Sequence, residues 1–83
     1  MKKRTLNAKE IINALAIYSD DQRDLNEHWD TFNLMRRMGF ITEEEWAKVF
    51  DTCSSWAFEG GKLVDADTGA VVEAWIQARE GRE

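Results

Sequence analysis

The sequence predicts a small all-α protein, a single bundle of three to four helices. Three observations predict this class: the 83 residues contain no proline, apolar residues recur at helical spacing, and glycines separate segments of helix length. A chain this short forms one domain, residues 1–83, whose core depends on large side chains. The four tryptophans meet that need, because an aromatic side chain buries roughly 150–250 Å².

The first helix is predicted at residues 8–18, after a basic segment at residues 1–6 that we expect to be frayed. Asn7 is a candidate N-cap, and Glu10 stands at the reciprocal position of a capping box. The helix is apolar around most of its circumference. A helix of this kind lies at the centre of a bundle or is shared with a neighbouring subunit, and we expect the central position.

The second helix is predicted at residues 22–38, after a polar break at residues 19–21 whose side-chain oxygens can cap it. Leu34 and Met38 fall on the side opposite the core. They are either isolated surface residues or the edge of a contact patch. The inward stripe comprises Leu25, Trp29 and Phe32.

A glycine corner separates the second helix from a third, predicted at residues 43–57. Gly39 is expected to end the second helix in a left-handed conformation. Thr42 is expected to cap the third helix, with Glu45 reaching back to the Thr42 amide in a capping box. The stripe of the third helix comprises Trp46, Val49, Phe50, Cys53, Trp56 and Ala57, before the stop at Gly60-Gly61.

Residues 62–83 allow two structures. Asp67 or Thr68 could cap a fourth helix at residues 68–80. A short β-hairpin at residues 62–73 could instead replace the start of that helix. We favour the helix, because the run at residues 75–79 prefers helix and an isolated hairpin is barely stable in water.

The charge is acidic and unevenly distributed. Eleven Lys/Arg stand against sixteen Asp/Glu, a net charge of −5, and three of the basic residues are Lys2, Lys3 and Arg4 at the tip. An acidic body repels phosphate backbones and favours a basic partner surface. With a single cysteine, and neither a signal peptide nor a membrane span in the sequence, we expect a cytoplasmic protein.

No residue set in the sequence predicts catalysis, a metal site or a cofactor. His28, one turn after Asp24, is the only acid–base candidate, and we expect an ordinary helix residue. Cys53 faces the core, where thiols are inert. Residues 65–69 have the start of a calcium loop, but Ile76 stands where the bidentate acid is needed. We therefore expect no enzyme, no metal and no cofactor.

The segment at residues 32–50 resembles the short helical hairpin appended to many bacterial proteins. In that family a helix ends in a glycine, followed by an aliphatic residue and a Thr-x-Glu-Glu-aromatic start. The resemblance covers under a quarter of the chain, and it implies paired helices without implying a function. The matching residues are Gly39, Ile41, Thr42, Glu44, Glu45 and Trp46.

The composition favours a small acidic protein-binding module: an inhibitor or regulator, of a kind that phages and mobile elements encode, that occupies a basic surface of a larger partner. Nucleic-acid-handling proteins are candidate partners. One alternative is a structural or accessory subunit, or a homodimer, built on helix 8–18. Another is a weak nucleic-acid-binding regulator, disfavoured because acids at residues 43–45 would meet phosphates. Acids flank the helices, so no membrane binding is expected. The candidate partner-binding residues are Glu43, Glu44, Arg36, Arg37, Met38 and Leu34.

Overall fold

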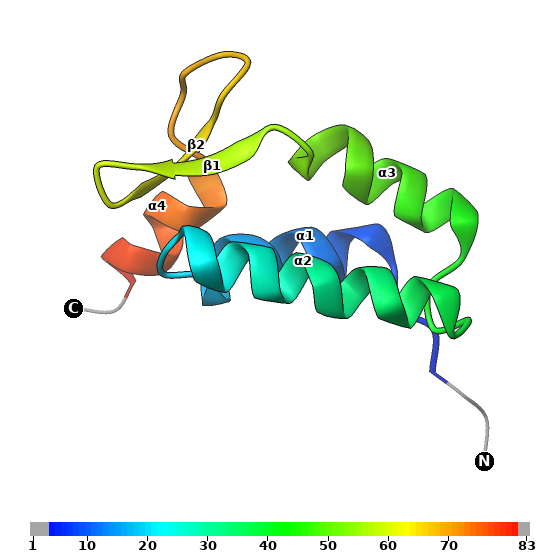
Figure 1. Ribbon diagram of the computed structural model, residues 1–83. Helices are drawn as coiled ribbons and strands as arrows, with labels where there is room; N and C mark the ends of the chain where they lie inside the picture. Colours follow the sequence, from blue (N-terminus) through cyan, green and yellow to red (C-terminus); the bar gives the residue numbers. More distant parts are fainter. Residues whose placement is uncertain (1–3, 82–83) are drawn as a thin grey trace.

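The computed structural model describes residues 4–81, which form four α-helices and one antiparallel β-hairpin (Figure 1). The chain is mostly helical, as predicted, but the all-α class omitted the hairpin. In Figure 1 α3 runs back along α2, while the hairpin and α4 lie at the end away from the α2–α3 corner. The elements are α1 (Ala8–Tyr18), α2 (Gln22–Arg37), α3 (Glu43–Cys53), β1 (Trp56–Glu59), β2 (Lys62–Asp65) and α4 (Glu73–Glu80).

Helix α1 is the central element, as its apolar circumference predicted. It packs against α2, α3 and α4, and Ile11, Leu15 and Ala16 are fully buried. The capping box at its start is present: Asn7 Oδ1 accepts the Glu10 amide, and the Glu10 side chain accepts the Asn7 amide. The other helices of the same chain therefore cover much of the apolar surface of α1. The homodimer alternative was based on that surface, and the fold explains it without a second copy.

The segment before α1 is held in place where the structure describes it. Residues 1–3 of the predicted frayed start lie outside the described residues. The backbone N–H of Leu6 donates to Phe40 O at 3.0 Å, and Arg4 pairs with Glu10. A backbone bond thus ties Leu6 to the distant α2–α3 corner, and the expected fraying of the basic start stays a prediction.

Helix α2 ends one residue before the predicted boundary, in the glycine motif that the sequence predicted. Gly39 has φ +85°. Its N–H donates to Arg36 O at 3.1 Å, and the next N–H, of Phe40, donates to Met35 O at 2.9 Å. This pair of bonds is a Schellman motif, which satisfies carbonyls left open at the end of the helix.

Helix α3 ends at Cys53, four residues before its predicted end. Ser54 and Ser55 are weak helix formers, and the aromatic residues that follow favour strand. Trp56 and Ala57 therefore belong to β1 and not to the helical stripe. The prediction failed because the apolar spacing continued across the break, although the structure had changed from helix to strand.

The hairpin joins β1 to β2 through Gly60 and Gly61, with φ of +61° and +79°. Positive φ at both central residues suits the tight turn whose twist matches that of paired strands. The predicted hairpin at residues 62–73 is present only in part. Residues 70–72 pair with β2 through the bridge Val64–Val71 and its two backbone bonds, whereas the partner of β2 along its whole length is β1. The N–H of Phe58 donates to Gln22 Oε1 of α2 at 2.8 Å.

Helix α4 begins five residues later than predicted, after Val72 and not after Asp67 or Thr68. Gly69, with φ +76°, turns the chain here, and Thr68 Oγ1 accepts the Ala70 amide within that turn. At the other end Arg79 donates to the Ile17 and Ser19 carbonyls and pairs with Asp20. These bonds fasten α4 to the end of α1.

Replacing Gly39 by alanine is expected to lower the free energy of unfolding by about 1–2 kcal/mol, because a Cβ is disfavoured in the left-handed region. Urea denaturation followed by circular dichroism measures the change. Gly81→Ala is the matched control, since Gly81 has φ −71°. Equal effects of the two substitutions would contradict the requirement for a glycine at the corner.

Candidate binding surface

The corner between α2 and α3 brings two predicted site residues into contact with each other. Nη1 of Arg36 lies 3.1 Å from each carboxylate oxygen of Glu43. The guanidinium also lies over the Trp46 ring, 5.7 Å from its centroid, and bonds to Asn33 Oδ1. The side chain of Arg36 is 27% exposed and that of Glu43 is 78% exposed. Arg36 is therefore chiefly a structural residue, while Glu43 remains accessible.

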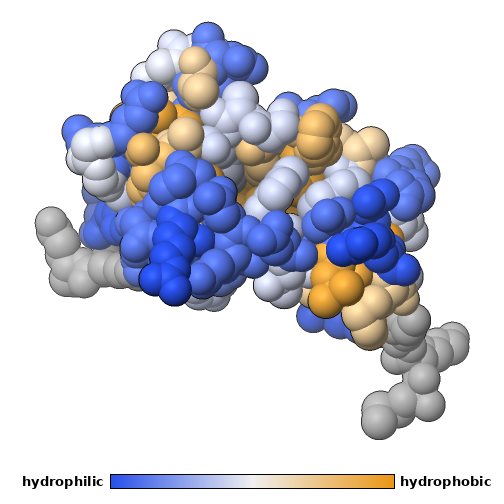
Figure 2. Space-filling model, in the orientation of Figure 1, coloured by the Kyte–Doolittle hydropathy of each residue, from blue (hydrophilic) through white to orange (hydrophobic). Residues whose placement is uncertain are grey.

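The other four predicted residues lie at the surface. Glu44 and Arg37 are exposed and form no salt bridge within residues 4–81. Leu34 and Met38 are 49% and 55% exposed, and they follow one another by one turn along α2. Figure 2 shows apolar surface toward the end of α2, next to strongly hydrophilic side chains. The corner thus combines exposed charge with exposed apolar area.

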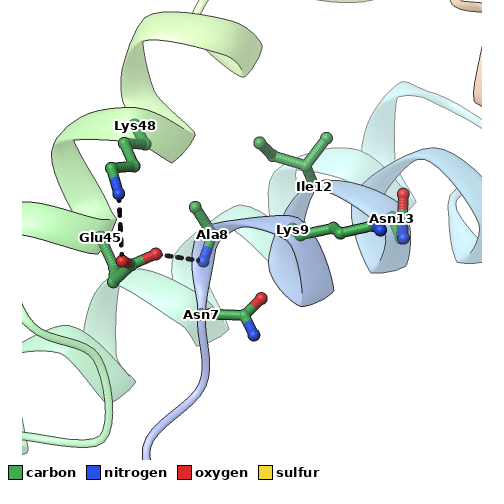
Figure 3. Close-up of a pocket in the computed structure, with 7 residues that line it drawn as sticks. All are labelled: Asn7, Ala8, Lys9, Ile12, Asn13, Glu45 and Lys48. Carbon is green, nitrogen blue, oxygen red and sulfur yellow. Dashed lines mark hydrogen bonds and ion pairs between the residues drawn. The ribbon is translucent and has the colours of Figure 1, made fainter.

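Glu45 does not complete the predicted capping box, although Thr42 does cap α3 through the Glu45 amide. Its carboxylate turns instead to α1, where Oε2 accepts the N–H of Ala8 at 2.7 Å (Figure 3). Oε1 bonds to Lys48 Nζ at 3.2 Å. The Ala8 amide, and then Lys48, lower the pKa of Glu45. The carboxylate therefore caps a helix distant in sequence.

A pocket of about 430 Å³ lies beside this cap, between α1 and α3 (Figure 3). The amide of Ala8, at the positive end of α1, already has the carboxylate of Glu45 as its acceptor. Glu45 thus competes with any anion for this helix terminus, and the pocket is a poor anion site. The lining residues are Asn7, Ala8, Lys9, Ile12, Asn13, Glu45 and Lys48.

A second depression, which we call the α2–α3 groove, has an aromatic floor. The ring centroid of Trp29 lies 5.1 Å from that of Trp46 and 6.3 Å from that of Phe50. Phe50 is nevertheless 53% exposed. Toward β1 the groove deepens into a pocket of about 280 Å³, lined by Gln22, Leu25, Asn26, Trp29, Cys53, Ser54 and Trp56.

The sequence did not reveal this groove. Helical spacing placed Trp29 and Phe50 on inward stripes, and it carries no information on how far apart two helices lie. The aromatic content, high for so short a chain, is the one signal that could have indicated a surface beyond the core.

The described residues contain no constellation for catalysis or metal binding. Within residues 4–81 no hydrogen bond joins His28 to an acid, and the Asp24 carboxylate accepts the backbone N–H of Asp20. No group of three or more His, Cys, Asp or Glu side chains in this range could hold a metal ion. In the loop with the start of a calcium site, the Asp65 carboxylate accepts from Ser55 Oγ and the Asp67 amide.

No protein-family model, curated protein or solved structure matches the chain. The resemblance of residues 32–50 to the bacterial helical hairpin therefore rests on their own sequence pattern. Among residues 4–81, no helix has the length and apolar composition needed to cross a bilayer.

Replacing Glu45 by glutamine is expected to lower the free energy of unfolding at neutral pH and to make that free energy less dependent on pH. The folded-state pKa of Glu45 is lowered, so its contribution is present above the unfolded pKa and is lost as pH falls through the folded pKa. The urea midpoints of the Glu45→Gln variant and of the unchanged protein should therefore differ at pH 7 and converge as the pH falls to 3. Glu44→Gln is the control, and an equal loss there would contradict the interhelical cap.

Cys53 is expected to resist thiol reagents in the folded protein although it lines the groove. Burial raises its pKa to about 12, so little of the reactive thiolate forms at pH 8. Labelling with a chromogenic disulfide should be slow in buffer and immediate in guanidinium chloride. Rapid labelling of the folded protein at pH 8 would show that the floor of the groove is open.

Proposed function

We propose that this protein is a protein-binding module, a small regulator or inhibitor that occupies a basic surface of a larger partner. The observation that carries the proposal is the charge left after internal pairing. Within residues 4–81, most carboxylates form no salt bridge, whereas the majority of the basic side chains form one. The paired basic residues are Arg4, Arg23, Arg36, Lys48 and Arg79.

Exposed apolar side chains support a protein partner over a small cation. Leu34, Met38 and Phe50 are large and about half exposed. Protein interfaces derive most of their binding energy from a few large anchors surrounded by polar contacts. Apolar anchors together with unpaired carboxylates suit a partner surface that is basic and also has apolar recesses.

The proposal extends to a mode of inhibition. A carboxylate carries a negative charge and hydrogen-bond acceptors, as a phosphate does, so an acidic surface competes for basic sites that bind nucleic acid. A nucleic-acid-handling protein is the proposed partner on this ground, and a phage or mobile element is a fitting source. Net charge and small size support this extension.

Capture from bacterial lysates at increasing salt tests the proposal. The immobilised protein is expected to retain a basic protein at low salt and to release it as salt rises, since exposed charges are screened beyond about 10 Å at 0.1 M ionic strength. Glu44→Lys should weaken retention, because Glu44 is exposed and unpaired at the corner. Glu80→Lys makes the same charge change on α4 and serves as the control.

Two results would count against the proposal. If no basic protein is recovered from the lysates of several hosts, the proposal of a basic protein partner is contradicted. Equal weakening by Glu44→Lys and Glu80→Lys would reduce the effect to net charge, with no role for the corner. Circular dichroism of both variants shows whether the helices persist.

A further inference from the structure

We propose that the α2–α3 groove is where the partner docks, and that it takes a basic amphipathic helix whose apolar side chains cover Phe50 and enter the adjoining pocket. This inference rests on the proposed function and assigns it a surface. It is carried by an exposed aromatic floor, a pocket continuous with that floor, and unpaired carboxylates along both sides.

The aromatic floor is incompletely covered. Trp46 is buried, Trp29 lies across it at 5.1 Å between ring centroids, and Phe50 rests on Trp29 with half its surface in solvent. Aromatic side chains, not close backbone packing, fill the space between α2 and α3, whereas α1 packs directly against both. An apolar side chain laid on Phe50 would remove from water the area that the fold leaves exposed.

The pocket is small enough to take an anchor side chain. Its volume is about 280 Å³, at the lower limit of the roughly 300–1,000 Å³ typical of small-molecule sites. Leu25, Trp29 and Trp56 supply apolar walls, and Cys53 adds a buried thiol whose raised pKa keeps it neutral. One or two inserted side chains of a partner suit this space.

The sides of the groove are acidic. Asn26 and Ser54 line the pocket from α2 and α3. Asp30 lies one turn after Asn26, and Asp51 lies one turn before Ser54, so helical spacing places each carboxylate next to a residue that lines the pocket. Both are exposed, and neither forms a salt bridge within the described chain.

The arginines on this side of α2 do not cancel these acids. Arg23 pairs with Glu27, and Arg36 pairs with Glu43, so each is compensated locally. Arg37 forms no salt bridge among residues 4–81, but it is the last residue of α2 and lies at the corner. The border therefore attracts Lys and Arg side chains and repels phosphates, which favours a basic protein segment over nucleic acid.

A helix is the segment shape that this groove fits. Helices α2 and α3 lie along one another (Figure 1), and Figure 2 shows apolar surface between hydrophilic side chains over this region. An amphipathic helix laid into such a groove contacts it through residues at i, i+3, i+4 and i+7. Its apolar face would meet Phe50 and the pocket, while its flanking basic residues would meet Asp30 and Asp51.

A synthetic peptide tests the inference directly. The probe is an amphipathic helix of roughly sixteen Leu, Lys and Ala residues, long enough to lie along the groove. It contains no tryptophan, so the fluorescence comes from the four tryptophans of the protein, of which Trp29, Trp46 and Trp56 lie at the groove. Titration is expected to give a saturable change at one peptide per chain. Peptides with Lys replaced by Glu, or Leu by Ser, should not bind.

Paired variants locate the site. Phe50→Ser, and separately the double variant Asp30→Lys/Asp51→Lys, should each weaken peptide binding by about tenfold or more, as loss of an anchor or of charge pairs does. Tyr18→Ser and Glu80→Lys alter an equally exposed aromatic and an acid elsewhere, and should leave binding within about twofold of the unchanged protein. Urea midpoints establish that each variant is folded, and the aspartate variant tests the groove without touching its floor.

The outcomes of these experiments distinguish an error in the proposed docking site from an error in the proposed function. Binding that survives the groove variants, or binding by the Ser-substituted peptide, would overturn the groove as the docking site. If lysate capture of a basic protein remains sensitive to Glu44→Lys in that case, the proposed function stands and only the location is wrong. Self-association through the groove, seen as a dimer in sedimentation that Phe50→Ser abolishes, would replace the basic helix with a second copy as the occupant.

Discussion

The tie between the starts of α1 and α3 is the constraint on which the remaining structure depends. The Glu45 carboxylate caps α1 at Ala8, and the backbone bond from Leu6 to Phe40 fastens the same segment to the corner. Helix α1 is thereby held beneath α3, where its buried face contacts all the other helices. A single carboxylate thus connects two helices that are 37 residues apart in sequence.

Features that depend on neighbours within one turn were accessible from the sequence. Asn7 and Thr42 cap their helices, and Gly39 ends α2, because each interaction spans only three or four residues and the residue type determines it. The helical stripes likewise placed Ile11, Leu15 and Val49 in the core. Local rules were sufficient where the interaction itself was local.

Features that depend on distant partners were not accessible. The aromatic residues after Ser55 continue a helical spacing, and only pairing with residues 62–65 makes them a strand. Glu45 has two amides within reach, its own N-cap and Ala8, and the tertiary structure selects the second. For the candidate surface, the sequence identified exposed residues at the corner but treated Arg36 as free, although Glu43 and Trp46 engage it. The groove required the separation of α2 and α3, which no spacing within one helix encodes.

The bond from Phe58 to Gln22 has a consequence for how the protein behaves at high concentration. A two-stranded ribbon offers an outer row of backbone donors and acceptors to which another chain can add. Gln22 takes one of these donors into a bond with α2, so an incoming strand finds that side obstructed by a helix. Without this bond the outward N–H of Phe58 would be available to pair with an incoming strand, so Gln22 protects the edge of the hairpin as well as joining it to α2.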